Sequence, residues 1–202
     1  MLSIAASEWL NKQDFMNGLS VNLLGVIEVT LSLLPLVRKA QGHVVHVSSV
    51  TSQLSLFGGG YCISKHFLAP YYMSCRRELP SFWVKVTITE PGFFKTNMTN
   101  TKKIILRLQE VWNCISSEVK DVYGEKFLES CLKSLKLMEH KCSPDLSLVT
   151  ECMEYALTAC HPRTQYSAGW DSKLFYLPLN YLPTFLVDAF LYLSSPKPAK
   201  AL

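Results

Sequence analysis

The sequence predicts an α/β fold in which helices alternate with short apolar strands, and three segments carry this prediction. Residues 14–40 have the length and apolar content of a long helix, and residues 43–48 (HVVHVS) follow as a short strand. A second strand is expected over residues 84–90 (VKVTITE), after a helix that begins near Gly60. A chain of 202 residues has the length of one domain, which buries roughly 70% of its unfolded surface.

The first helix is predicted to take Asp14 as its N-terminal cap and to be ended by Pro35 and Gly42. Apolar residues leave it almost no polar face, which indicates a helix that is buried on all sides. Asn22 interrupts the apolar run, and a buried amide needs hydrogen-bond partners. From the residues alone, a satisfied polar group in the core is the ordinary interpretation of Asn22.

The strongest candidate for chemistry lies in residues 42–65 (GHVVHVSSVTSQLSLFGGGYCISK). If the turn at residues 58–60 opens a helix, Tyr61 and Lys65 lie on one face, about one turn apart. A nearby ammonium favours the phenolate and lowers the pKa of a tyrosine from its usual value of about 10, which suits proton transfer in alcohol and ketone chemistry. The alternative is a packed ring beside a solvated lysine. His46, on the strand, is expected to bond to a neighbour rather than to act in catalysis.

Pro70 conflicts with the helix predicted after Gly60. A proline inside a helix removes a backbone hydrogen bond and costs about 3 kcal/mol. Because Pro70 comes after Tyr61 and Lys65, the spacing of these two residues is compatible with it. The sequence does not decide how the rest of that helix packs.

The C-terminal half is predicted to be mostly helical. Residues 101–142 show helical periodicity with mixed charge, and Pro144-Asp145 precede an amphipathic helix. A last strand is expected over residues 172–177. Residues 174–193 are strongly apolar, but they contain two prolines together with Asn180 and Asp188, which argue against a plain transmembrane helix. A segment against a membrane surface and a buried helix are the two alternatives.

The composition limits the classes of partner. Hydrophobic residues make up 49% of the chain and charged residues only 18%, which favours an apolar partner, a membrane surface or uncovered apolar faces. A net charge of +4, not gathered in one patch, argues against nucleic acid. Seven cysteines without a Cys-x-x-Cys pair indicate reduced thiols and no metal site. One zinc set is conceivable: Cys142, Cys160, His140 and His161. The first residues lack the basic flank and apolar core of a signal peptide.

Three stretches together resemble the short-chain dehydrogenase/reductase family: VNLLGVIEVTLSLLPLVRKAQG, VVHVSSV with GGGYCISK, and VKVTITEPGFFKTNMTN. Within it the chain is most similar, from about Trp9 onward, to the microsomal retinol and hydroxysteroid dehydrogenases of the retinol dehydrogenase 16 type. The resemblance implies an NAD-dependent oxidoreductase of lipid alcohols, retinol or hydroxysteroids, at the endoplasmic reticulum membrane. It also implies a doubly wound, mainly parallel Rossmann-like sheet, with residues 101–145 as a lid over the substrate.

The resemblance assigns catalytic roles to four residues. Tyr61 would transfer the proton, while Lys65 would lower the pKa of Tyr61 and hold the cofactor's ribose. Ser49 would orient the substrate oxygen, with Ser48 as the alternative, although either serine also reads as a capping hydroxyl at a strand end. Asn22, in an Asn-x-x-Gly motif, would hold a water linked to the lysine.

The resemblance places the cofactor beyond the C-terminal ends of both strands, where open α/β sheets bind their ligands. The nicotinamide half of NAD would contact six residues: Tyr61, Lys65, Pro91, Gly92, Phe93 and Thr96. The Pro-Gly pair reads equally as an ordinary turn. The family's Gly-rich turn, which binds the dinucleotide's pyrophosphate at a helix N-terminus, has no counterpart in this sequence.

We therefore expect residues 1–202 to form a single partial dehydrogenase domain that is N-terminally truncated, without the first strands and without an N-terminal anchor. The strand at residues 43–48 would then be an open edge, with apolar faces of the sheet uncovered. Two other functions stay open: a catalytically inactive remnant that dimerises with itself or with an intact dehydrogenase, and a membrane-surface adaptor that uses residues 174–193.

Overall fold

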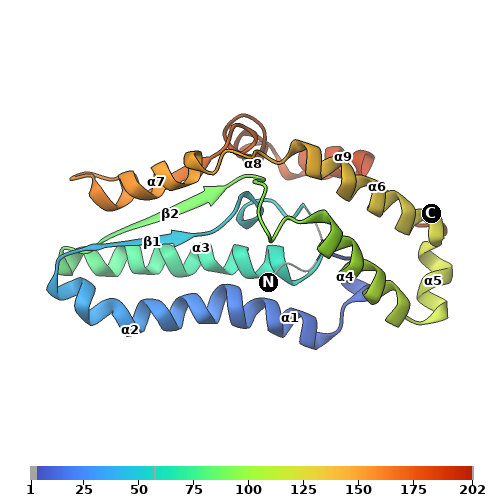
Figure 1. Ribbon diagram of the computed structural model, residues 1–202, viewed down its shortest axis with the longest axis horizontal. Helices are drawn as coiled ribbons and strands as arrows, with labels where there is room; N and C mark the ends of the chain where they lie inside the picture. Colours follow the sequence, from blue (N-terminus) through green and yellow to red (C-terminus); the bar gives the residue numbers. More distant parts are fainter. Residues whose placement is uncertain (1–3, 57, 202) are drawn as a thin grey trace.

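A three-stranded parallel sheet lies at the centre of the computed structural model, which describes residues 4–56 and 58–201 (Figure 1). Its strands are β1 (His43–Val47), β2 (Lys85–Pro91) and β3 (Gln165–Ala168), in the order β1-β2-β3. His43 pairs with Lys85, and Ile88 pairs with Gln165. The α/β prediction and the first two strands are confirmed, and β1 lies at an edge of the described sheet as expected.

The third strand was predicted in the wrong place. Residues 172–177 are helical: Ser172–Tyr176 form a π-helical turn (η5), which continues into the short helix α8 (Leu177–Asn180). The strand lies earlier, and Gly169 follows it with φ of +97°, a conformation that glycine adopts at little cost. A short apolar run such as LFYL fits a helix and a strand equally well, so periodicity alone did not decide between them.

The first helix is continuous from Lys12 to Lys39 and consists of α1 (Lys12–Leu19), the π-helical η2 (Ser20–Leu24) and α2 (Gly25–Lys39). Its cap is Asn11 and not Asp14, which instead completes a capping box with it. The helix also runs through Pro35, against the prediction. Pro35 and Leu31 are both exposed, so water can solvate the carbonyl that loses its partner.

The predicted burial of this helix on all sides is wrong for this chain. Leu34 and Val37 pack on the core, whereas the opposite face is exposed, with Leu36 66% and Val29 59% accessible. The exposed apolar face, called the α2 face below, comprises Val21, Leu24, Val29, Leu31, Leu33 and Leu36. The stretch Lys12–Lys39 is long and apolar enough to cross a membrane, and an 18-residue window within it has a mean hydropathy of 1.8.

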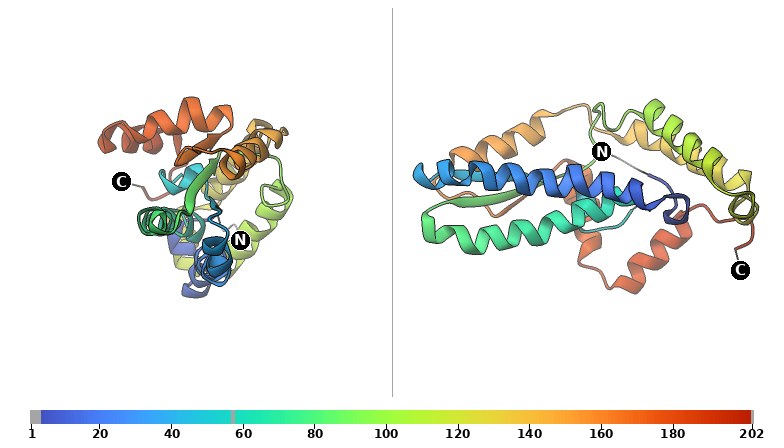
Figure 2. Two further views of the ribbon diagram at one scale, coloured as in Figure 1. Left: turned by 90° about the vertical axis from the view of Figure 1, so that its left-hand side faces the viewer. Right: turned by 90° about the horizontal axis from the view of Figure 1, so that it is seen from below.

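Helices cover both faces of the sheet (Figures 1 and 2). On one face α3 (Gly60–Glu78) lies between the strands and α2, and α7 (Ser147–Thr158) lies on the other face. α3 runs through Pro70, which is exposed, while Leu68 is fully buried. The packing face of α3 is therefore intact despite the proline.

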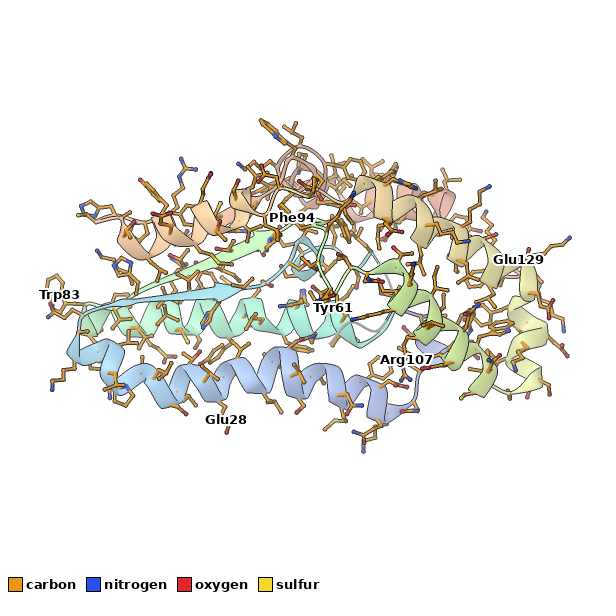
Figure 3. The ribbon with its side chains drawn as sticks, in the orientation of Figure 1. Glu28, Tyr61, Trp83, Phe94, Arg107 and Glu129 are labelled. Carbon is orange, nitrogen blue, oxygen red and sulfur yellow. The ribbon has the colours of Figure 1, made fainter. Side chains whose placement is uncertain are left out.

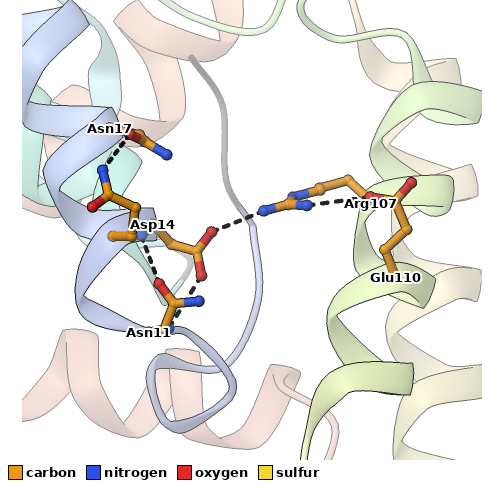
Figure 4. Close-up of polar contacts among 6 residues, drawn as sticks. Asn11, Asp14, Asn17, Arg107 and Glu110 are labelled. Atoms are coloured by element: carbon orange, nitrogen blue, oxygen red, sulfur yellow. Dashed lines mark hydrogen bonds and ion pairs between the residues drawn. The ribbon is translucent and has the colours of Figure 1, made fainter.

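Residues 101–142 are helical, as predicted, and form an arm of three helices: α4 (Thr101–Cys114), α5 (Ser117–Tyr123) and α6 (Glu125–Lys141). The arm has its own core, in which the rings of Trp9 and Trp112 meet edge to face at 4.9 Å. Arg107 of α4 forms an ion pair of 2.8 Å with Asp14 of α1 (Figure 4), which joins the arm to the first helix.

The remaining elements are short. Asp145 accepts hydrogen bonds from Ser147, so α7 begins close to the predicted position. After α8 the chain turns into α9 (Thr184–Ser194), whose side chains are mostly exposed. Three 3-10 turns complete the described elements: η1 (Ser7–Trp9), η3 (Val50–Ser52) and η4 (Leu79–Phe82).

His46 gives the fold a testable dependence on pH. Its ring is buried beside Tyr71 and Tyr72, and Nε2 lies 3.3 Å from the Thr30 hydroxyl, the neighbour contact that was expected. Burial lowers the pKa of His46 to about 4 from 6.5. The unfolded chain therefore binds the proton first, and stability falls as the pH falls from 6.5 toward 4. We expect a loss of up to about 3 kcal/mol in the free energy of unfolding.

The substitution His46→Asn removes this titration, so urea unfolding of the variant at pH 5.0 and 7.5 should give nearly equal free energies. The matched control is His161→Asn, at an exposed position, which should keep the full pH dependence of the original chain. An equal pH slope in His46→Asn and the original chain would contradict the assignment.

Candidate active site

A cavity of about 200 Å³ opens where the C-terminal ends of β1 and β2 meet the start of α3. Figure 3 shows Tyr61 in the first turn of α3 and Phe94 on the loop after β2. The wall contains polar groups from the strand ends and apolar groups from the arm and α7. Its described lining is Ile4, Val47, Ser48, Ser49, Tyr61, Lys65, Pro91, Gly92, Phe93, Phe94, Thr96, Met98, Thr99, Met138, Leu146 and Val149.

Tyr61 and Lys65 both line this cavity, so the predicted shared face of α3 is confirmed. The Lys65 ammonium donates a 3.0 Å hydrogen bond to the carbonyl of Val47, the last residue of β1. The start of α3 is fixed by close packing, since a Cβ on Gly60 would lie 3.2 Å from the Phe15 Cα of α1. The helix start is thereby held against both the first helix and the strand end.

The electrostatics differ from the prediction. Burial raises the pKa of Tyr61 above its ordinary value of 10.0, and a hydrogen bond with the Ser49 side chain opposes that rise. Burial also lowers the pKa of Lys65 below 10.5. The predicted lowering of the Tyr61 pKa by Lys65 is therefore wrong: desolvation raises this pKa, and Lys65 is not among the groups that shift it.

Ser49 and Ser48 have different surroundings. Ser49 caps the turn η3, and its Oγ accepts the Thr51 N–H at 3.3 Å, while the same side chain interacts with Tyr61 and opposes the rise in the pKa of that phenol. Ser48 points toward α3, where its hydroxyl donates to the Lys65 carbonyl at 3.3 Å. Ser49 thus combines the capping role and the contact with the phenol, and this geometry favours it over Ser48 as the orienting serine.

Asn22 is linked to the site through Ser64. Its Nδ2 donates to the Ser64 hydroxyl at 3.0 Å, and that hydroxyl donates to the Tyr61 carbonyl at 2.8 Å. Asn22 is buried in η2 and is not part of the cavity lining. The structure therefore links it to the backbone of the helix that carries Tyr61 and Lys65.

The loop after β2 brings the predicted nicotinamide-binding residues to the cavity, but its backbone is already engaged. The Phe93 N–H donates to Asp171 Oδ2 at 2.7 Å, and the Phe93 carbonyl accepts the Ser143 N–H at 2.9 Å. The Thr96 hydroxyl lies 3.2 Å from that of Thr99. Asp171 was missed by the sequence analysis, because it follows β3 and nothing near it in the sequence indicates its contact with this loop.

The conceivable zinc set does not form a site in the described part of the chain. Cys142 is buried and its thiol contacts the Met138 carbonyl at 3.3 Å, whereas Cys160 is exposed. Among residues 4–56 and 58–201, no three His, Cys, Asp or Glu side chains gather closely enough to hold a metal ion.

The comparison with known families decides the family to which the fold belongs. A family model described as short chain dehydrogenase matches residues 3–104. The chain belongs to the short-chain dehydrogenase family. Its Ser, Tyr and Lys candidates lie within the matched part, as the sequence resemblance implied.

Members of this family account for the similarity along nearly the whole chain. Retinol dehydrogenase 16 from Mus musculus is 62% identical over 196 residues, which cover 97% of this chain and 62% of that protein. 17-beta-hydroxysteroid dehydrogenase type 6 from Homo sapiens is 49% identical over 198 residues, covering 98% and 62%. The chain therefore spans less than two thirds of the length of these relatives.

Solved structures of the family share the fold. A short-chain dehydrogenase/reductase from Burkholderia phymatum in complex with NAD superposes with a TM-score of 0.64. The match covers 99% of this chain and 66% of that chain at 17% identity, so the likeness concerns the fold.

Gly92 allows a test of how the cavity loop is held. A Cβ at this position would overlap the Asp171 carboxylate, which must then move and release the Phe93 N–H. We expect Gly92→Ala to lower the free energy of unfolding by about 1–3 kcal/mol, measured by urea denaturation. Most of this cost should vanish in an Asp171→Ala background, because the overlapping group is gone.

The control is Gly42→Ala, where the nearest atom to a new Cβ is Val37 Cγ1 at an ordinary 3.6 Å. This change should leave stability nearly unaltered. Equal costs of Gly92→Ala with and without Asp171 would show that the carboxylate does not hold the loop.

Proposed function

We propose that the chain acts as an NAD-dependent oxidoreductase of lipid alcohols, of the retinol or hydroxysteroid class. The observation that carries this proposal is the convergence of Ser49, Tyr61 and Lys65 on one cavity at the C-terminal ends of two parallel strands. A phenol, an ammonium and a hydroxyl in that arrangement suit proton transfer to or from a substrate oxygen. The names of the relatives support the same class of substrate.

The residues at the cavity fit the nicotinamide half of NAD. When bound, NAD supplies the hydride acceptor for alcohol oxidation and the hydride donor for carbonyl reduction. The Lys65 ammonium and the Tyr61 hydroxyl would hold the ribose, while Pro91, Gly92, Phe93 and Thr96 would face the nicotinamide. Gly92 exposes bare backbone to the cavity, and Thr96 contributes a hydroxyl. These donors and acceptors are the groups that an amide and a sugar require.

Tyr61 handles the proton. In oxidation its phenolate takes the proton from the substrate hydroxyl, and in reduction its phenol returns a proton to the carbonyl oxygen. Since burial raises the pKa of Tyr61, the phenol is protonated at neutral pH, and oxidation should accelerate as the pH rises. Ser49 orients the substrate oxygen, and Asn22 supports the site through Ser64.

The apolar wall suits a lipid-like substrate. Met138 from α6 and Leu146 and Val149 from the start of α7 face the polar groups across the cavity. We assign residues 101–145 the role of a substrate lid, because the end of this arm contributes Met138. Residues 1–202 then act as a single partial short-chain dehydrogenase domain.

A second candidate function is that of a non-catalytic partner, which dimerises with another copy or with a related dehydrogenase. The α2 face favours this alternative, since six apolar side chains are exposed along one helix. Nucleotide binding separates the two candidates, because the partner function needs no cofactor.

The substitution Tyr61→Phe should lower turnover by about 10²–10⁴-fold, because it removes the proton-transferring hydroxyl. Turnover is measured as NADH absorbance with retinol or a hydroxysteroid, and Tyr155→Phe is the control at an exposed ring. Tyr61→Phe removes one of the two groups that would hold the ribose and should weaken NADH binding modestly, whereas Lys65→Met removes the ammonium and should weaken it more. Full activity in Tyr61→Phe would contradict the catalytic assignment, and no saturable NADH fluorescence in the original chain would favour the partner function.

We also propose that the chain lies against the endoplasmic reticulum membrane through its C-terminal segment. α9 exposes Phe185 and Leu193, and the Lys197 ammonium lies 4.1 Å from the Tyr192 ring. Exposed aliphatic and aromatic side chains next to a flanking lysine suit the boundary between water and lipid.

Flotation with phosphatidylcholine vesicles tests this placement. Phe185→Ser combined with Leu193→Ser should weaken vesicle binding about tenfold or more, since each side chain loses the free energy of burial in lipid. The matched control is Leu33→Ser with Leu36→Ser on the α2 face, which should float like the original chain. Weaker vesicle binding in the α2-face variant, with unchanged binding in the Phe185 and Leu193 variant, would show that the α2 face contacts the membrane instead of α9.

A further inference from the structure

Glu90 is a buried carboxylate that has no role in the proposed mechanism. It immediately precedes Pro91, which lines the cavity. It lies near the end of β2 and is only 3% exposed. Its Oε1 accepts the Ser52 hydroxyl at 2.6 Å, and its Oε2 accepts the side-chain amides of Gln53, at 2.7 Å, and Gln165. All three donors are neutral, and no ion pair involves Glu90 in the described part of the chain.

A buried carboxylate without a counter-ion is costly, so its hydrogen bonds must compensate for lost hydration. A neutral or apolar residue would avoid this cost if the position only filled space. Three donors from two separate segments instead converge on the two oxygens of Glu90. This arrangement points to a carboxylate that holds those segments in place.

Two of the three donors belong to the turn that Ser49 opens. Ser52 donates its backbone N–H to the Ser49 carbonyl at 3.0 Å, and Thr51 donates its N–H to the Ser49 hydroxyl at 3.3 Å. The turn η3 is therefore closed by backbone bonds at Ser49 and clamped to β2 at Ser52 and Gln53. Moving the clamped end would move Ser49 with it.

We propose that Glu90 is a positioning residue that holds Ser49 against Tyr61 by clamping the turn η3 to the end of β2. The third donor, Gln165 at the start of β3, fixes the carboxylate from the opposite side. The effect on chemistry rests on the proposed function of Ser49, whereas the effect on the turn does not.

The substitution Glu90→Gln keeps the size of the side chain and changes what it accepts. One carboxylate oxygen becomes an NH₂ group, which cannot accept from the amides of Gln53 or Gln165, and the Ser52 hydroxyl would have to reverse its role and accept from it; the bonds that remain also lose the negative charge that strengthens them. The double variant Glu90→Gln with Gln165→Glu returns a carboxylate to the cluster, facing the new amide. The matched control is Thr87→Val on the same strand, where a buried hydroxyl donates to the Arg163 carbonyl at 3.1 Å.

The first measurement is amide hydrogen exchange at Thr51. Because the Thr51 N–H donates to the Ser49 hydroxyl, its exchange rate depends on whether Ser49 keeps its position. Relative to the Ile88 amide on β2, exchange at Thr51 should accelerate about tenfold in Glu90→Gln. Thr87→Val should leave the ratio of the Thr51 exchange rate to the Ile88 exchange rate unchanged. The double variant should bring this ratio part of the way back to that of the original chain. An unchanged Thr51 ratio in Glu90→Gln would overturn the proposal, whether or not the chain turns over substrate.

The second measurement is a double-mutant cycle in kcat. Glu90→Gln should lower kcat about tenfold when Ser49 is present, and by no more than about twofold in a Ser49→Ala background. Equal losses in both backgrounds would show that Glu90 does not act through Ser49 and would overturn the proposal. If the original chain has no turnover, the proposed function fails, and the exchange ratio at Thr51 alone decides whether Glu90 positions the turn.

Discussion

The bond between the Lys65 ammonium and the Val47 carbonyl ties the first turns of α3 to the end of β1. It joins a helix and a strand at the one edge where parallel strands leave their carboxyl ends together. Tyr61 shares a helical face with Lys65, so fixing the lysine also fixes the direction of the phenol. The cavity exists at this edge because the helix start is held there and the loop after β2 closes over it.

How much of the site could be predicted depends on the range of the interactions. Tyr61 and Lys65 are one helical turn apart, so local geometry predicted their shared face. Ser49 follows an apolar strand, which again is a local pattern. Asp171 contacts Phe93 from 78 residues away, and no sequence pattern connects them. Glu90 was read only as the end of a strand, since its donors come from η3 and β3.

The errors in the predicted fold have a common physical origin. Periodicity reports which side chains are apolar, but it does not say what covers them. The apolar content of residues 14–40 was therefore read as complete burial, whereas the α2 face is exposed. Pro35 and Pro70 were given too much weight, because both lie on exposed sides where water can replace the lost backbone bond. The run LFYL was assigned to a strand although its apolar pattern also fits the helix that the structure contains.

The site balances two opposing demands on Tyr61. A buried phenol is shielded from water, which strengthens its hydrogen bonds, but the same burial raises its pKa and holds back the phenolate. Lys65 is buried too, and the same loss of hydration lowers its own pKa. The hydrogen bond from Ser49 opposes the rise at Tyr61, and it does so without placing a further charge in the cavity. The position of Ser49 therefore matters twice, once for the substrate oxygen and once for the acidity of the group that moves the proton.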